Sequence, residues 1–218
     1  NSPAVLVGDF IYSRAFQLMV QLNNSAIMKV LADTTNTIAE GEVQQLINAG
    51  DPDTSEQSYL EVVRKKTAIL FSAATECAAL LCDASQQQSA DLAAYGLHLG
   101  MAFQLQDDVL DYTGDSDELG KNIGDDLAEG KATLPLIYTI AKGSDEQSKL
   151  IRQAIEKKDT SQIEQVAKAV NESGGLQYTQ QLAEKEVEQA INKLSSLPES
   201  DYKGVLTELA NFSLHRSH

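Results

Sequence analysis

The most constraining feature of this sequence is the spacing of its apolar residues, which recur at helical intervals without sustained alternation between apolar and polar positions. Helical spacing places apolar side chains on one face of a helix, whereas a half-buried strand needs a period of two. The 218 residues contain only four prolines, Pro3, Pro52, Pro135 and Pro198, so long helical runs stay uninterrupted. The sequence therefore predicts an all-α fold, a helical bundle.

We expect nine helices, whose boundaries follow from capping signals and from glycines at helix ends. Their predicted ranges are 4–22, 25–48, 55–82, 87–113, 126–142, 145–157, 161–172, 175–194 and 201–214. Capping boxes are predicted for Thr54 with Gln57, Ser85 with Gln88, Ser144 with Gln147, and Ser161 with Glu164. Helices before residue 142 are long and apolar and are expected inside the bundle, while the later, more charged ones are expected to form an outer layer.

Length and charge exclude several classes of protein. A chain of 218 residues with 42% hydrophobic content is expected to form one domain, residues 1–218. A formal net charge of -15 argues against nucleic-acid binding, which depends on clustered Lys and Arg. No run of 18 apolar residues is present, so we expect no transmembrane segment, and the negative net charge suits a cytoplasmic protein.

An acidic stretch carries the strongest chemical signal. It reads "AFQLQDDVLDYTGDSDELGKNIGDDLAEGK", residues 102–131, and within it Asp107, Asp108 and Asp111 share one side of a predicted helix. Carboxylates that face one way bind hard divalent cations, and Mg²⁺ typically takes one or two of them together with water and phosphate oxygens. The pattern points to a metal-bridged diphosphate. A DDxxD string by itself is equally typical of a solvated, acidic helix end.

The residues after the acidic stretch favour the first interpretation. Lys121 and Lys131 follow it, with glycines at Gly120, Gly124 and Gly130. Lysines on flexible backbone can meet phosphate oxygens that a metal ion leaves uncovered. An acidic patch followed by glycine-spaced lysines is therefore a sensible clamp for a diphosphate.

At this point the sequence resembles a known family. The stretch "GMAFQLQDDVLDYTGDSDELGKNIGDDLAEGKATLPL" resembles the second aspartate-rich region of the trans-isoprenyl (polyprenyl) diphosphate synthases. Three further blocks are similar to preceding family blocks and occur in the same order: "VLVGDFIYSRAF" at 5–16, "AEGEVQQL" at 39–46 and "KKTAILFSAA" at 65–74. The resemblance implies an isoprenoid synthase-type all-α bundle around a central cavity.

The resemblance also implies roles for individual residues. Those that would hold Mg²⁺ are Asp107, Asp108 and Asp111, with Asp107 as a direct ligand, and Asp126, which would contact the metal or its water. Those that would bind the allylic diphosphate and help it depart are Lys66, Thr67, Gln104, Lys121 and Lys131. Glu42 and Gln45 could line the cavity, although packing or a subunit interface explains them equally well.

The activity that the resemblance implies is condensation of isopentenyl diphosphate onto an allylic diphosphate, with farnesyl diphosphate as the expected allylic substrate. The expected product is octaprenyl diphosphate for quinone side chains, and a homodimer is expected. A class I terpene cyclase and a regulatory subunit without catalytic activity are the alternatives.

One part of the family pattern lies upstream of the block that "VLVGDF" resembles, namely a first aspartate-rich motif and the site for isopentenyl diphosphate. This chain begins too late to contain either. We expect that it is the C-terminal two thirds of a longer synthase and carries only half of the site. A subunit that lacks those parts is the alternative.

Overall fold

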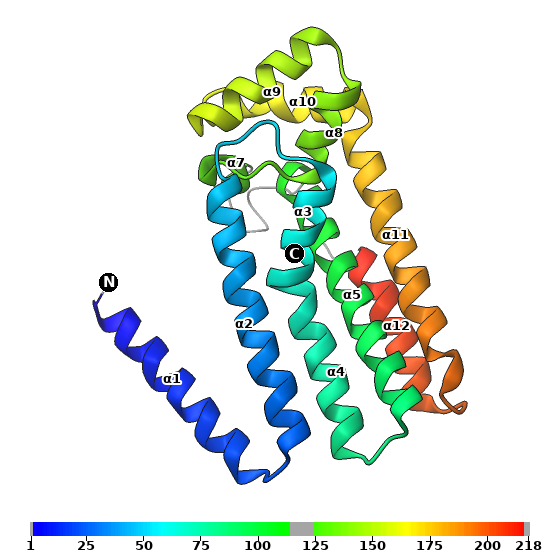
Figure 1. Ribbon diagram of the computed structural model, residues 1–218. Helices are drawn as coiled ribbons and strands as arrows, with labels where there is room; N and C mark the ends of the chain where they lie inside the picture. The colour runs from blue at the N-terminus through cyan, green and yellow to red at the C-terminus, as the bar shows by residue number, and fades with distance from the viewer. Residues whose placement is uncertain (1, 114–123, 216–218) are drawn as a thin grey trace.

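The computed structural model describes residues 2–113 and 124–215, and within these ranges all regular structure is helical (Figure 1). The elements are α1 (Ser2–Gln21), α2 (Ser25–Asn48), α3 (Glu56–Val63), η1 (Arg64–Ala68), α4 (Ile69–Leu81), α5 (Gln86–Thr113), α7 (Asp125–Glu129), α8 (Leu134–Lys142), α9 (Asp145–Lys157), α10 (Ile163–Ser173), α11 (Gly175–Lys193), η2 (Leu194–Ser196) and α12 (Asp201–His215). The predicted all-α bundle is confirmed, whereas a single domain over 1–218 stays a prediction. None of the described helices is long and apolar enough to cross a membrane.

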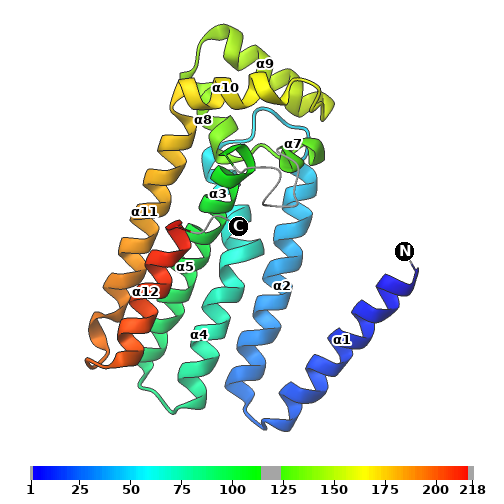
Figure 2. The ribbon, with the colours of Figure 1, turned by 180° about the vertical axis from the view of Figure 1, so that it is seen from behind.

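The bundle is organised around α5, which packs against α4 on one side and α11 on the other. Figures 1 and 2 show α2 beside α4, and α12 beside α5 and α11, while α9 and α10 cross one end of the bundle. At the edge of the bundle beyond α2, α1 leans away from the other helices, and none of its residues is buried.

The predicted division into inner and outer helices is confirmed for α9 and α10 but is wrong for α1, which was expected inside and has no buried residue, and for α11. This helix buries Thr179, Ala183, Val187 and Ala190, and its small side chains allow close packing along α5. The charged residues Glu184, Lys185 and Glu188 are exposed, so a high charge content concealed an inner helix.

The helix predicted over 126–142 is in fact two helices, α7 and α8. Gly130 ends α7 with a φ of 78°, in the left-handed region that glycine adopts without steric cost. Pro135 then lies in the first turn of α8, where the missing N–H of proline removes no helical hydrogen bond. The segment 130–133 between them borders the cavity described below.

The helix predicted over 55–82 is continuous in space but contains a π-helical turn, η1, between α3 and α4. Two glycines press on this turn from either side. A Cβ on Gly41 of α2 would lie 2.9 Å from Cβ of Lys65, and one on Gly100 of α5 would lie 2.6 Å from Cα of Ala68. The turn is therefore pinned between α2 and α5 by contacts that only glycine permits.

Two of the four predicted capping boxes are confirmed. Ser144 and Gln147 form a reciprocal pair at the start of α9, and Ser85 and Gln88 form one before α5. The other two are wrong, because Ser55 rather than Thr54 caps α3, and α10 begins without a capping side chain.

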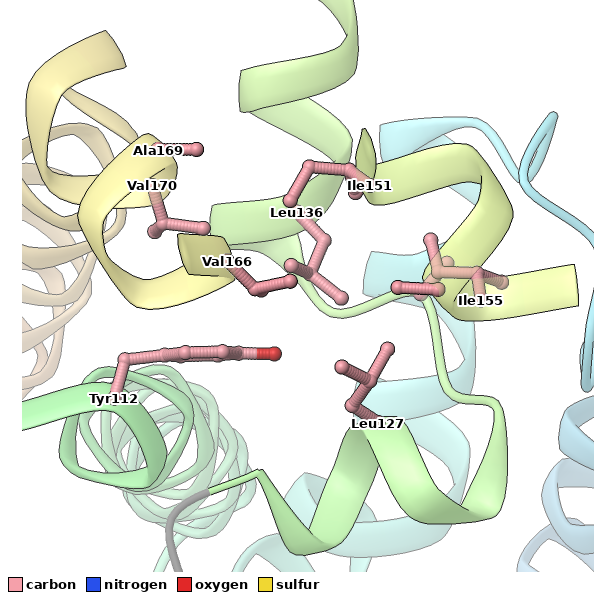
Figure 3. Close-up of a cluster of buried hydrophobic side chains, with 10 residues drawn as sticks. Tyr112, Leu127, Leu136, Ile151, Ile155, Val166, Ala169 and Val170 are labelled. Carbon is pink, nitrogen blue, oxygen red and sulfur yellow. The ribbon is translucent and has the colours of Figure 1, made fainter. Parts of the chain in front are cut away.

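A cluster of apolar side chains holds the crossing helices α9 and α10 against the end of the bundle (Figure 3). Tyr112 of α5 and Leu127 of α7 point toward Leu136 of α8, Ile155 of α9 and Val166 of α10. Because α9 and α10 rest on α7 and α8, they help to fix the segments that border the cavity.

Candidate functional site

A cavity of about 450 Å³ lies at the end of α5 beneath α7. Its walls come from α2, α3, η1, α5, α7 and the segment 130–133. The predicted site residues that line it are Lys66, Thr67, Gln104, Asp107, Asp108, Asp111, Asp126 and Lys131. The remaining one, Lys121, lies outside the residues that the structure describes. The structure thus brings together eight side chains from four elements, while their roles stay predictions.

Asp108 is the most enclosed carboxylate of the acidic motif, with 1% of its surface exposed. Its Oδ1 accepts a hydrogen bond from Nε2 of Gln104 at 3.0 Å, and its Oδ2 accepts one from the hydroxyl of Tyr59. Burial and the charge of Asp126 raise the pKa of Asp108 to about 8, although the two hydrogen bonds oppose this rise.

Asp111 lies one turn further along α5, and its two oxygens do not both have a hydrogen-bond partner among the described residues. Its Oδ2 is buried and has no hydrogen-bond partner among the residues described. Burial, followed by the charges of Asp126 and Asp125, raises the pKa of Asp111 to about 7. An ionised Asp111 would therefore be stabilised by a cation placed in the cavity.

These carboxylates fit a magnesium ion that is shared with a diphosphate. Within 2–113 and 124–215, no three His, Cys, Asp or Glu side chains converge closely enough to hold a metal by themselves. Mg²⁺ needs only one or two carboxylates when water and phosphate oxygens complete its octahedron. The buried Oδ2 of Asp111, which has no hydrogen-bond partner among the described residues, is an oxygen ligand suited to that role.

The π-helical turn η1 presents Lys66 and Thr67 to the cavity. The Lys66 ammonium lies 3.1 Å from Oε2 of Glu42 and donates to Oε1 of Gln45 at 3.1 Å. Of these two partners on α2, Gln45 lines the cavity. Both residues therefore contact Lys66, while packing or a subunit interface stays open as their role.

Lys131 also lines the cavity and follows the left-handed Gly130. Its ammonium lies 2.7 Å from Oδ1 of Asp126 and 2.8 Å from Oε2 of Glu129. Burial lowers the pKa of Lys131, but the hydrogen bonds to both carboxylates outweigh burial and hold this pKa well above its ordinary value. The side chain is a permanent positive charge beside the acidic motif.

A backbone contact joins the α2–α3 loop to the segment that carries Lys131. The N–H of Gly50 donates to the carbonyl of Gly130 at 2.8 Å, and both glycines have positive φ angles. A Cβ on Gly130 would come within 3.1 Å of the nitrogen of Gly50. The close approach therefore depends on glycine at position 130, whereas at position 50 the positive φ of 84° favours glycine.

Sequence reasoning missed Tyr59, the hydroxyl partner of Asp108. The two residues are 49 positions apart and belong to different helices, α3 and α5. In the sequence, "EQSYLEVV" resembles any amphipathic helix with an aromatic core residue. No local pattern could have linked this tyrosine to the acidic motif.

Comparisons with known proteins point to one family. The family described as polyprenyl synthetase matches residues 1–173. Octaprenyl diphosphate synthase from Haemophilus influenzae is 48% identical over 219 residues, covering 100% of this chain and 67% of that protein. All-trans-nonaprenyl-diphosphate synthase (geranyl-diphosphate specific) from Rhodobacter capsulatus is 48% identical over 216 residues, covering 99% of this chain and 66% of the relative.

A solved structure points to the same family. Polyprenyl synthase from Caulobacter crescentus CB15, complexed with calcium and isoprenyl diphosphate, superposes with a TM-score of 0.95 at 41% identity. The superposition covers 100% of this chain and 67% of that one. The chain thus spans about two thirds of the length of these similar proteins.

Proposed function

Since the chain belongs to the polyprenyl synthetase family of prenyltransferases, we propose that it is part of an enzyme that makes octaprenyl diphosphate. The reaction is head-to-tail condensation of isopentenyl diphosphate onto an allylic diphosphate, with farnesyl diphosphate as the allylic substrate. The observation that carries this proposal is the cavity that the acidic motif of α5 lines together with Lys66 and Thr67 of η1. The product length rests on the Haemophilus relative, since the Rhodobacter relative has the name of a nonaprenyl synthase.

Magnesium is the proposed metal, held by the acidic residues Asp107, Asp108, Asp111 and Asp126 together with water and diphosphate oxygens. The ion would supply positive charge where negative charge develops on the departing diphosphate. The calcium and isoprenyl diphosphate bound in the Caulobacter relative support this combination of divalent cation and diphosphate.

The polar and basic residues around the cavity would bind the allylic diphosphate. They are Lys66, Thr67, Gln104, Lys121 and Lys131, of which Lys121 lies in the part of the chain without a described structure. Donors that are fixed before the reaction stabilise developing charge without reorganising. Lys66 and Lys131 meet this condition, because each is held by two neighbouring side chains.

Assembly and location complete the proposal. We propose a homodimer because α1 and α2 expose large apolar side chains, among them Phe10 at 70%, Leu46 at 75% and Ile47 at 74%. A cytoplasmic location and a supply of octaprenyl chains to quinones are proposed with it.

A product assay tests the proposal directly. The intact protein is incubated with Mg²⁺, farnesyl diphosphate and labelled isopentenyl diphosphate, and the products are sized by chromatography after dephosphorylation. We expect a linear C40 alcohol. Cyclic hydrocarbons would identify a terpene cyclase, and activity that appears only after a second protein is added would identify a subunit. A linear product of another length would correct the octaprenyl assignment alone.

A further inference from the structure

A chain of hydrogen bonds connects the acidic motif on α5 to the π-helical turn. The hydroxyl of Tyr59 donates to Oδ2 of Asp108, and Nε2 of Gln104 donates to Oδ1 of the same carboxylate at 3.0 Å. The hydroxyl of Thr67 then donates to Oε1 of Gln104 at 3.0 Å. Four side chains from α3, η1 and α5 therefore form one continuous network along the cavity wall.

The network gives Asp108 a different situation from that of Asp111. Asp108 is 1% exposed, and each of its oxygens already accepts a hydrogen bond from a neighbouring side chain. Asp111 instead has a buried oxygen without a hydrogen-bond partner in the described parts of the chain. Of these two carboxylates, Asp111 has the oxygen available to a ligand, whereas Asp108 is occupied in holding its neighbours.

The backbone around the network is fixed as well. Gly100 of α5 lies so close to η1 that a Cβ on it would come within 2.6 Å of Cα of Ala68. Tyr59 itself is only 8% exposed, and it packs in the same apolar cluster as Val63 and Leu105. With the helices held by packing, the hydrogen bonds set the orientation of the side chains between them.

We propose that Tyr59 is a positioning residue, which acts through Asp108 and Gln104 to hold Thr67 and the acidic motif in a fixed relative orientation. This inference rests on the proposed function, since the motif and Thr67 are the groups that would hold the metal and the allylic diphosphate. Asp108 then has two parts, as a member of the proposed metal site and as the anchor of the network. Residues behind metal ligands commonly have such a role, and their loss typically lowers metal affinity or activity 10- to 100-fold.

The first test compares two tyrosine substitutions in the intact protein. Tyr59→Phe removes the hydroxyl that reaches Asp108, and Tyr95→Phe removes a hydroxyl that donates to the carbonyl of Leu206 at 2.8 Å, remote from the cavity. Both variants lose one hydrogen bond from a buried ring, so both should unfold at slightly lower temperature. We expect only Tyr59→Phe to raise the KM for farnesyl diphosphate and the half-maximal Mg²⁺ concentration, each about tenfold.

Equal KM values and Mg²⁺ requirements in the two variants would show that Tyr59 only stabilises the fold, and the inference would be wrong. If the wild-type protein makes no prenyl diphosphate, the proposed function fails instead. The same pair of variants is then compared by calorimetric binding of inorganic diphosphate in Mg²⁺. Weaker binding by Tyr59→Phe alone supports the inference, and equal binding contradicts it.

A second test asks whether Tyr59 and Asp108 act as a unit. Asp108→Asn keeps the shape of the side chain but replaces one acceptor oxygen by a donor, so the hydroxyl of Tyr59 and the amide of Gln104 no longer each have an acceptor oxygen. If the two residues act together, adding Tyr59→Phe to Asp108→Asn changes KM and the Mg²⁺ requirement by less than twofold. Additive effects of about tenfold each would overturn the inference, because they would show that Asp108 acts independently of Tyr59.

Discussion

Two segments of α5 differ in whether their buried polar atoms have hydrogen-bond partners. In the core segment, residues 86–103, the hydroxyl of Tyr95 donates to the carbonyl of Leu206, and His98 Nδ1 lies 2.7 Å from Oε2 of Glu186. In the site segment, residues 104–113, Oε1 of Gln106 and Oδ2 of Asp111 are buried, and the described residues offer them no hydrogen-bond partner.

This difference indicates that the core segment of α5 contributes mainly to stability and the site segment mainly to function. Buried polar atoms are normally paired, so an unpaired one is a candidate ligand site. The core segment is instead defined by close packing, with Gly96 and Gly100 against α4 and η1. Substitutions in the site segment should therefore change activity more than stability, and substitutions in the core segment should do the reverse.

The largest expected effect is on activity, from Asp107→Asn in the site segment. Removing one charge from the proposed metal site should lower kcat/KM about 10³-fold, because stabilisation of the transition-state charge is lost. Steady-state kinetics with farnesyl diphosphate measure this loss, and thermal unfolding should change by only a few degrees. Glu188→Gln, an exposed change on α11, is the matched control and should leave kcat/KM unaltered. A retained kcat/KM in Asp107→Asn would remove this residue from the site.

The second effect is on stability, from Gly96→Ala in the core segment. The added Cβ would meet the carbonyl oxygen of Phe71 at 2.4 Å, so α4 and α5 must separate. We expect the free energy of unfolding to fall by about 3 kcal/mol in urea titrations, with kcat/KM per folded molecule retained.

Gly204→Ala is the control for this change, because a Cβ there has no neighbour within 4 Å and the residue lies in α12. It should raise the free energy of unfolding by about 0.5 to 1 kcal/mol through helix propensity. If Gly96→Ala were as well tolerated as Gly204→Ala, the close packing of the core segment would be refuted.

The smallest expected effect comes from His98→Ala, also in the core segment. The imidazole and Glu186 are partly exposed, with 23% and 21% of their side-chain surfaces accessible, so solvent weakens their interaction. We expect a loss of about 1 kcal/mol in the free energy of unfolding and an unchanged kcat/KM. A double-mutant cycle with Glu186→Ala isolates the pair, and a coupling free energy of zero would show that the contact contributes nothing to stability.

Much of the fold could be predicted because its signals are local. Helical spacing and caps such as Ser144 with Gln147 depend on residues within one or two turns. The break between α7 and α8 could have been predicted, because Gly130 and Pro135 lie inside the range 126–142, where glycine weakens a helix and proline breaks it. The inner position of α11 depends on packing against α5, which no local pattern records.

The candidate site divides in the same way. Asp107, Asp108 and Asp111 could be grouped because they lie within five positions on one helix. Lys66 and Thr67 joined them only through resemblance to a family, since helix packing brings η1 to α5. Tyr59 could not be found, because its link to Asp108 spans 49 positions and depends on the geometry of the π-helical turn between α3 and α4.

That π-helical turn has a consequence for insertions and deletions. A π turn holds one residue more than the same turn of α-helix, so it is a one-residue insertion absorbed without breaking the helix. Deleting one residue between Arg64 and Ala68 would restore a regular helix and rotate α3 by roughly 100° relative to α4. Tyr59 would then point away from Asp108 while α4 kept its place against α5. The length of this short segment, and not only its residue types, is therefore under constraint.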